Sequence, residues 1–389
     1  MTADTSVFIF ANPTDLILEI PTATQNRANP QTQSFSNLAS RYQAYINELC
    51  LSAVLPWLQE DLTPQAKVWP NPTVLSSFWE LVNGIALTSG ASRFILVPSE
   101  TIDLSELRVP QEWVDIPSWA GDYYLAVQVE PDEGYVKVWG YCTHEQLKAK
   151  GNYDVGDRTY SLDATDIIKD ISVLAVAREL CPEELTRRTI QQLPTIPQQQ
   201  AQNLIDRLGN PEILTPRLAI PFQLWGALIE HGGWRQNLYQ RRLGLPEQWS
   251  VLQWLQSGVS QVAETVGWGE LHLELSARAR GIEETQPQQV LSRQLAIAGQ
   301  IYELITPQGE PEATIWRFEL RNIAVGAAIP GGFKLRLLTE DLQSFPNNED
   351  IAITAVEQLY VEVSLEPGEG IVWEIEPLPE NYDREILKF

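Results

Sequence analysis

Residues 269–389 repeat one pattern, in which short runs of β-branched and aromatic residues alternate with turn-forming sequences. The runs include TIWRFEL and LYVEVSL, and the turns are QGEP, PGG, PNNED and PGEG. Strands separated by short turns pair with antiparallel neighbours, and a chain with many of them buries their apolar faces between two sheets. The pattern therefore predicts an antiparallel β-sandwich over residues 269–389.

The N-terminal part of the chain mixes helical and strand periods. Apolar residues recur at helical spacing after Ser36, through LASRYQAYINELCLSAVLPW, which predicts an amphipathic helix. Two hairpins are expected next, one turning at SGAS (89–92) and one at PDEG (131–134). A further helix is expected to begin at Asp163, a plausible N-cap. Together these elements predict an antiparallel sheet with helices packed against it.

The length of the chain indicates more than one domain. A single hydrophobic core rarely serves more than about 250 residues, and this chain has 389. Residues 183–268 carry helical patterns and include a linker rich in proline and glutamine at 191–200. The predicted fold class is α+β, with an α+β N-terminal domain at 1–182, a helical region at 183–268 and an acidic β-sandwich domain at 269–389.

The charge of the chain is acidic and unevenly distributed. The net charge is −24, and residues 340–389 hold 13 acidic residues against 2 basic ones. An acidic surface repels phosphate backbones, so direct nucleic-acid binding is disfavoured. The acidic C-terminal region fits a basic protein partner, although such an excess is more often a solvated surface.

Cysteine usage and hydropathy suggest a cytoplasmic protein. The three cysteines are widely spaced and odd in number, which implies no disulfide framework and favours a reducing compartment. The first twenty residues lack the basic start and the unbroken apolar run of a signal peptide. No segment approaches the roughly 20 apolar residues of a membrane span.

No catalytic, cofactor or metal motif is recognisable. Cys142 and His144 lie close together in GYCTHEQLK, but no second pair of zinc ligands is visible. Residues i and i+2 of a strand share a face without their reactive atoms pointing at each other, which disfavours a catalytic dyad. His231 precedes two glycines as in lipase oxyanion loops, yet the chain lacks a G-x-S-x-G nucleophile elbow. The prediction is therefore no catalytic residue, no cofactor and no metal, and the residues favour a protein that is not an enzyme.

Aromatic residues raise an alternative function. The chain holds 13 tryptophans, and a carbohydrate-binding or glycoside-hydrolysing protein would combine exposed rings with carboxylates such as Glu112, Asp115 and Asp122. Rings distributed over the whole chain more often fill cores. Trp113, in PQEWVDIP, is the ring for which burial is least expected.

The candidate interaction surface comprises Trp113, Glu362 and Glu374. Strand alternation in LYVEVSLEPGEGIVWEIEPL turns Val361 and Val363 to one face and Glu362 to the other. If the two runs pair across PGEG, Glu362 and Glu374 line one acidic surface.

Several long strings resemble one family. VPQEWVDIPSWAGDYYLAVQV, VWGYCTHEQLK, DRTYSLD and the ending from LLTEDLQSF to REILKF resemble the cyanobacterial proteins grouped as domain of unknown function 1822. The resemblance implies a cytosolic, regulatory protein of a cyanobacterium, and it carries over neither an activity nor catalytic residues. The sequence as a whole favours a non-enzymatic interaction or regulatory protein with an unknown protein partner.

Overall fold

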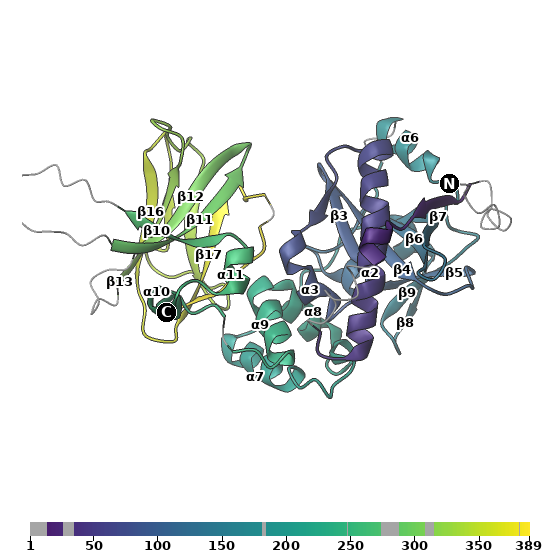
Figure 1. Ribbon diagram of the computed structural model, residues 1–389, viewed down its shortest axis with the longest axis horizontal. Coiled ribbons are helices and arrows are strands. Elements are labelled where there is room, and N and C mark those ends of the chain that lie inside the picture. The colour runs from purple at the N-terminus through teal and green to yellow at the C-terminus, as the bar shows by residue number, and fades with distance from the viewer. Residues whose placement is uncertain are drawn as a thin grey trace, which may run out of the picture. The chain divides into compact units, whose positions relative to one another are not determined.

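The computed structural model describes residues 14–25, 35–180, 184–246, 248–273, 288–307, 315–380 and 382–389. It is a mixed α+β structure with several antiparallel sheets (Figure 1). The chain forms two compact units: unit 1 comprises Met1–Thr195, Leu204–Glu230 and Arg241–Leu243, and unit 2 comprises Ile196–Asn203, His231–Gln240 and Gly244–Phe389. Among the described residues, no helix combines the length and the apolar character that a bilayer crossing requires.

The main sheet of unit 1 has six strands in the order β1-β7-β6-β4-β3-β2. In chain order these strands are β1 (Leu16–Glu19), β2 (Lys67–Trp69), β3 (Ile85–Ser89), β4 (Ser92–Ser99), β6 (Tyr123–Glu130) and β7 (Tyr135–Thr143). Both predicted hairpins are confirmed, because β3 pairs with β4 and β6 pairs with β7 in antiparallel register.

The prediction of a wholly antiparallel N-terminal sheet is wrong at one pair. β4 and β6 are parallel neighbours, with Phe94 opposite Tyr123. The chain between them leaves the sheet through β5 (Glu106–Pro110) and the short helix α4 (Glu112–Asp115), and it returns in the original direction. A tight turn cannot make a parallel connection, which requires such a crossover.

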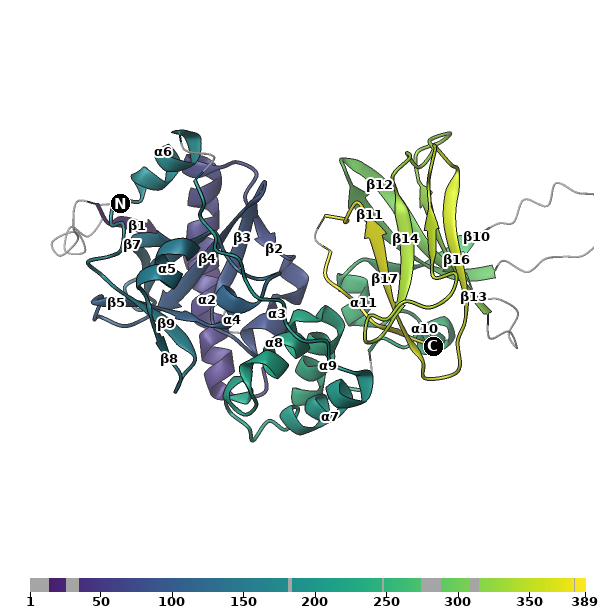
Figure 2. The same cartoon turned by 180° about the vertical axis from the view of Figure 1, so that it is seen from behind.

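Helices cover the main sheet. α2 (Leu38–Trp57) begins at Asn37, whose side chain accepts a hydrogen bond from the backbone N–H of Ser40 at 2.9 Å. Its apolar face packs against β4, β6 and β7 (Figure 1). α5 (His144–Lys150) lies on the opposite face of the sheet (Figure 2). Because both faces are covered, β6 is buried along nearly its whole length instead of on alternate residues.

A small antiparallel sheet completes the strands of unit 1, in the order β5-β9-β8. It pairs β5 with β9 (Thr159–Asp163) and β9 with β8 (Asn152–Asp154). The helix predicted from Asp163 starts later, as α6 (Ser172–Leu180). The carboxylate of Asp163 instead accepts a hydrogen bond from the N–H of Thr165 and stabilises a turn. The carboxylate of Asp170 accepts a hydrogen bond from the N–H of Ser172, where the helix begins.

The region after the linker is helical, as the sequence predicts, and it contributes to both units. Its elements are α7 (Gln198–Leu208), η4 (Pro216–Leu218), α8 (Phe222–Glu230), α9 (Gly232–Arg242), α10 (Val251–Ser257) and α11 (Gln261–Thr265). Within unit 1, the guanidinium of Arg242 pairs with Glu80 at 2.6 Å, and both side chains are fully buried.

Unit 2 contains two further antiparallel sheets, of five and four strands. The first has the order β10-β11-β12-β13-β16, with β10 (Trp268–Leu273), β11 (Gln288–Ile297), β12 (Gln300–Pro307), β13 (Ile315–Asn322) and β16 (Gln358–Ser364). The second has the order β15-β14-β17-β18, with β14 (Lys334–Thr339), β15 (Glu349–Ile351), β17 (Gly370–Glu376) and β18 (Leu387–Lys388). One hydrophobic core includes Phe318 of the first sheet and Trp373 of the second.

Candidate functional site

Trp113 lies in the core of unit 1 and not on its surface, which corrects the sequence-based proposal. The side chain is only 1% exposed, and its ring is 6.1 Å from that of Phe78 and 5.2 Å from that of Trp119. Its indole N–H donates to the carbonyl oxygen of Asn83 at 2.7 Å. An aromatic ring with a satisfied polar atom and stacked neighbours stabilises the core, so Trp113 offers no surface to a partner.

Glu362 and Glu374 do not share a surface strip across the PGEG turn, because their strands lie in different sheets. β16, which carries Glu362, pairs with β13, whereas β17, which carries Glu374, pairs with β14. The predicted alternation in β16 is confirmed, with Val361 buried and Glu362 exposed. Glu362 lies 3.8 Å from the guanidinium of Arg317.

The carboxylate of Glu374 is hydrogen-bonded to two arginines of unit 2. It accepts a hydrogen bond from Arg336 at 2.9 Å and one from Arg384 at 2.8 Å. Burial raises the pKa of this carboxyl, but the two guanidinium groups outweigh burial and hold the pKa below its ordinary value of 4.5. Glu374 is therefore part of an ion-pair network and is not a free acidic group.

Acidification is expected to destabilise unit 2 through Glu374. Because the folded pKa lies below the unfolded value of 4.5, the contribution of this carboxylate is complete above that pH and is lost as the pH falls through the folded pKa. Urea unfolding of the wild type and of Glu374→Gln, at about pH 7 and about pH 3, measures this contribution. The variant should lose less stability on acidification; equal losses would contradict the ion-pair assignment.

His144 and Cys142, which lie two residues apart in the sequence, are both buried in unit 1. His144 is buried; its Nε2 lies 3.0 Å from the carbonyl oxygen of Val114, and its Nδ1 accepts from the N–H of Arg188 at 3.1 Å. Burial lowers the pKa of His144, and it raises the pKa of the Cys142 thiol to about 12. The imidazole has hydrogen-bond partners at both ring nitrogens, so it is poorly suited to act as a base. A thiol with a raised pKa is poorly suited to act as a nucleophile.

His231 and His272 lie in unit 2. His231 is buried in unit 2, and burial lowers its pKa well below the ordinary value. His272 lies in β10 and Cys181 lies outside the described residues. Within the described ranges, no three His, Cys, Asp or Glu side chains are grouped so that they could hold a metal ion.

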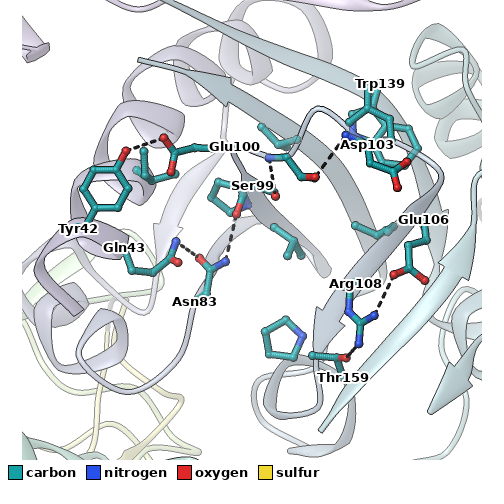
Figure 3. Close-up of a pocket in the computed structure, with 18 of the residues that line it drawn as sticks. Tyr42, Gln43, Asn83, Ser99, Glu100, Asp103, Glu106, Arg108, Trp139 and Thr159 are labelled. Carbon is teal, nitrogen blue, oxygen red and sulfur yellow. Dashed lines mark hydrogen bonds and ion pairs between the residues drawn. The ribbon is translucent and has the colours of Figure 1, made fainter. Parts of the chain in front are cut away.

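A pocket of 590 Å³ opens in unit 1 (Figure 3). Its apolar lining comes from α2 and the main sheet and includes Ile46, Val97, Val127 and Trp139. Its polar lining comes from α2, the loop after β4, and β5 and β9. The pocket therefore combines an apolar floor with a polar and charged rim.

One side of the pocket is built on α2 and the end of β4. The hydroxyl of Tyr42 donates to the carboxylate of Glu100 at 2.5 Å, and this bond, with burial, raises the pKa of Tyr42 to about 12. The amide of Gln43 donates to Asn83 at 2.7 Å, and Asn83 donates to the carbonyl oxygen of Pro98 at 3.1 Å. These bonds fix the orientation of the lining side chains, which Figure 3 shows beside the open space.

The opposite side of the pocket is built on the small sheet. The guanidinium of Arg108 contacts three carboxylates, with shortest distances of 2.9 Å to Glu106, 3.3 Å to Asp154 and 2.8 Å to Asp157. It also donates to the hydroxyl of Thr159 at 3.1 Å. Of these carboxylates only that of Glu106 lines the pocket, and the guanidinium of Arg217 lines it as well.

The pocket is not predictable from the sequence, although one segment carries a signal of it. The segment SETIDLSEL, residues 99–107, carries three acids and no base between two strands. Glu100, Asp103 and Glu106 all line the pocket. Their convergence with α2 depends on the packing of segments distant in sequence, which no local pattern reveals.

No curated protein and no solved structure matches the chain. A family model described as "Protein of unknown function (DUF1822)" matches residues 18–388. The chain therefore belongs to the DUF1822 family.

Proposed function

We propose that the protein is a non-enzymatic interaction protein that receives part of a partner protein in the pocket of unit 1. The observation that carries this proposal is the pocket itself, with its volume of 590 Å³, apolar floor and charged rim. Apolar pockets with a few fixed polar groups are the usual form of small-molecule sites, and protein interfaces likewise place anchor side chains in well-packed pockets.

The state of the reactive groups favours binding over catalysis. Acid–base and nucleophilic chemistry needs a side chain whose titrating atom is within reach of a substrate. The imidazole of His144 and the thiol of Cys142 are buried, and neither lines this pocket. The charged groups of the rim are held by neighbours, as in the contacts of Arg108 and Glu100.

A carbohydrate-binding or glycoside-hydrolysing function receives less support. A sugar platform requires exposed aromatic faces, yet Trp139 of the pocket is only 7% exposed. Trp113, Trp119, Trp225 and Trp373 are fully buried. Tyr42, which is 51% exposed, is the ring in this pocket on which a sugar could stack.

The location and source expected from the sequence are part of this proposal. The family resemblance and the composition support a cytosolic protein of a cyanobacterium. A β-sandwich over residues 269–389 is supported by the two sheets of unit 2, whose residues contribute to one core. Reversible binding of a partner protein would be the basis of a regulatory role.

Blocking the pocket tests the proposed function. Ser99 is exposed and lines the pocket, so Ser99→Trp should obstruct it without disturbing the core. Affinity capture from a lysate of the source cells should retrieve a partner with the wild type and lose it with the variant. Circular dichroism of both proteins checks that the variant is folded. Retention of every captured protein by folded Ser99→Trp would contradict a binding role for the pocket.

A further inference from the structure

The geometry points to a lysine or arginine side chain of a partner protein as the occupant of the unit 1 pocket. This inference rests on the proposed function and adds the chemistry of the partner. The charges of the rim, the apolar floor and the exposed residues beside the pocket support it.

Two carboxylates of the rim have no cationic partner among the residues that the structure describes. Glu100 and Asp103 line the pocket, and no described residue forms an ion pair with either of them. The carboxylate of Glu100 accepts a hydrogen bond from Tyr42, and that of Asp103 accepts one from the N–H of Ser105 at 3.0 Å. Both contacts are with uncharged groups, so neither contact supplies a positive charge.

The cations at the pocket are already outnumbered or paired. Arg108 faces three carboxylates, and Arg217 forms two hydrogen bonds with Glu112, at 2.9 and 2.7 Å. Neither guanidinium is therefore available to neutralise Glu100 or Asp103. An added positive charge is the complement that this rim lacks.

The apolar floor selects among positive groups. Lysine and arginine carry a long apolar stem below a charged head, and they bury the stem while the head reaches a polar surface. Val97, Leu107, Val127 and Trp139 line the pocket with the few apolar atoms that they expose, which a narrow stem can contact, and the carboxylates of the rim offer the head an acceptor. A hydrated metal ion would gain nothing from this floor.

Exposed apolar residues beside the pocket favour a protein over a free amine. Tyr42 is 51% exposed, and Leu38, one turn earlier on α2, is 76% exposed. Ile102, between the lining residues Thr101 and Asp103, is 88% exposed. Apolar side chains next to a charged pocket are typical of interfaces, in which an anchor side chain enters a pocket and its flanking residues cover the rim.

A peptide titration tests the inference on the full chain. The probe is a coumarin-labelled Leu-Ala-Arg-Ala-Leu peptide, and the comparison peptide has citrulline in place of arginine, which keeps the shape and removes the charge. Fluorescence anisotropy should show that the wild type binds the arginine peptide about tenfold more tightly, as expected for one charge-assisted contact. The preference should weaken as salt screens the rim.

Two double variants test which carboxylates cause the preference for the arginine peptide. Glu100→Gln with Asp103→Asn removes two charges while it keeps oxygen acceptors for Tyr42 and Ser105, and it should abolish the preference for arginine. Glu60→Gln with Asp61→Asn removes two exposed charges elsewhere in unit 1 and should leave the preference intact. Equal effects of the two double variants would assign the preference to net charge and overturn the inference.

The remaining outcomes separate this inference from the proposed function. If Ser99→Trp loses the native partner but Glu100→Gln with Asp103→Asn keeps it, the pocket binds a partner and the cationic occupant is wrong. If folded Ser99→Trp keeps every partner, the proposed function is wrong. If spermidine binds as tightly as the arginine peptide, the occupant need not belong to a protein, and the inference of a protein partner is overturned. Cellohexaose binding that Ser99→Trp abolishes would favour the carbohydrate function.

Discussion

Glu112→Ala is expected to lower the free energy of unfolding of unit 1 by about 3 to 5 kcal/mol. The Glu112 carboxylate is fully buried, accepts two hydrogen bonds from Arg217 at 2.9 and 2.7 Å, and accepts a third from the indole N–H of Trp225 at 2.8 Å. Its removal leaves the indole N–H without an acceptor, and it leaves the guanidinium without a counter-charge and with backbone carbonyl partners alone among the described contacts. Urea unfolding monitored by circular dichroism measures the loss, and hydrogen exchange in β5 and β9 assigns it to unit 1.

The matched control for this variant is Glu145→Ala. Glu145 forms the same two-bond contact with an arginine, at 2.6 and 2.8 Å to Arg188, but the pair is exposed to solvent. Water solvates the partner that remains, so this substitution should change stability far less. Similar losses for the two variants would show that burial does not determine the strength of these pairs.

Phe389→Ala should destabilise unit 2 by about 3 to 5 kcal/mol. The Phe389 side chain follows β18 and is buried in the core of unit 2, where its ring lies 4.6 Å from that of Trp316 and 5.9 Å from that of Phe318. Both neighbours belong to β13, so the substitution opens a cavity between the last residue and the five-stranded sheet.

Leu378→Ala is the control for the Phe389 prediction. Leu378 lies in the same C-terminal part of the chain but is 65% exposed, and its truncation should cost less than about 0.5 kcal/mol. Thermal unfolding of both variants, followed by tryptophan fluorescence, makes the comparison. An equally small loss for Phe389→Ala would mean that this residue does not pack as described.

Local patterns in the sequence predicted the elements whose cause is local. The hairpin at SGAS forms because Gly90 adopts a positive φ of 58° in the turn between β3 and β4. The period of two in β16 correctly buries Leu359 and Val361 and exposes Tyr360 and Glu362, since one face of that strand is covered.

Features that depend on distant segments were not predictable in the same way. The sequence contains no signal that separates β16 and β17, so Glu374 was expected beside Glu362 although the two strands pair with different partners. Trp113 looks exposed between two prolines, but Phe78 and Trp119 enclose it in the fold. The pocket likewise forms because α2, the loop after β4 and the small sheet converge.

Site-specific photo-cross-linking from the pocket tests the central claim most directly. A benzoylphenylalanine at Ile102, which is 88% exposed between the lining residues Thr101 and Asp103, reports what binds at the pocket in a lysate of the source cells, and one at Glu60, which is exposed in the same unit, reports background. We predict a protein adduct that forms from position 102 alone, with the cross-linked partner peptide containing lysine or arginine next to apolar residues. Identical adducts from the two positions, or partner peptides without a basic residue, would contradict the account.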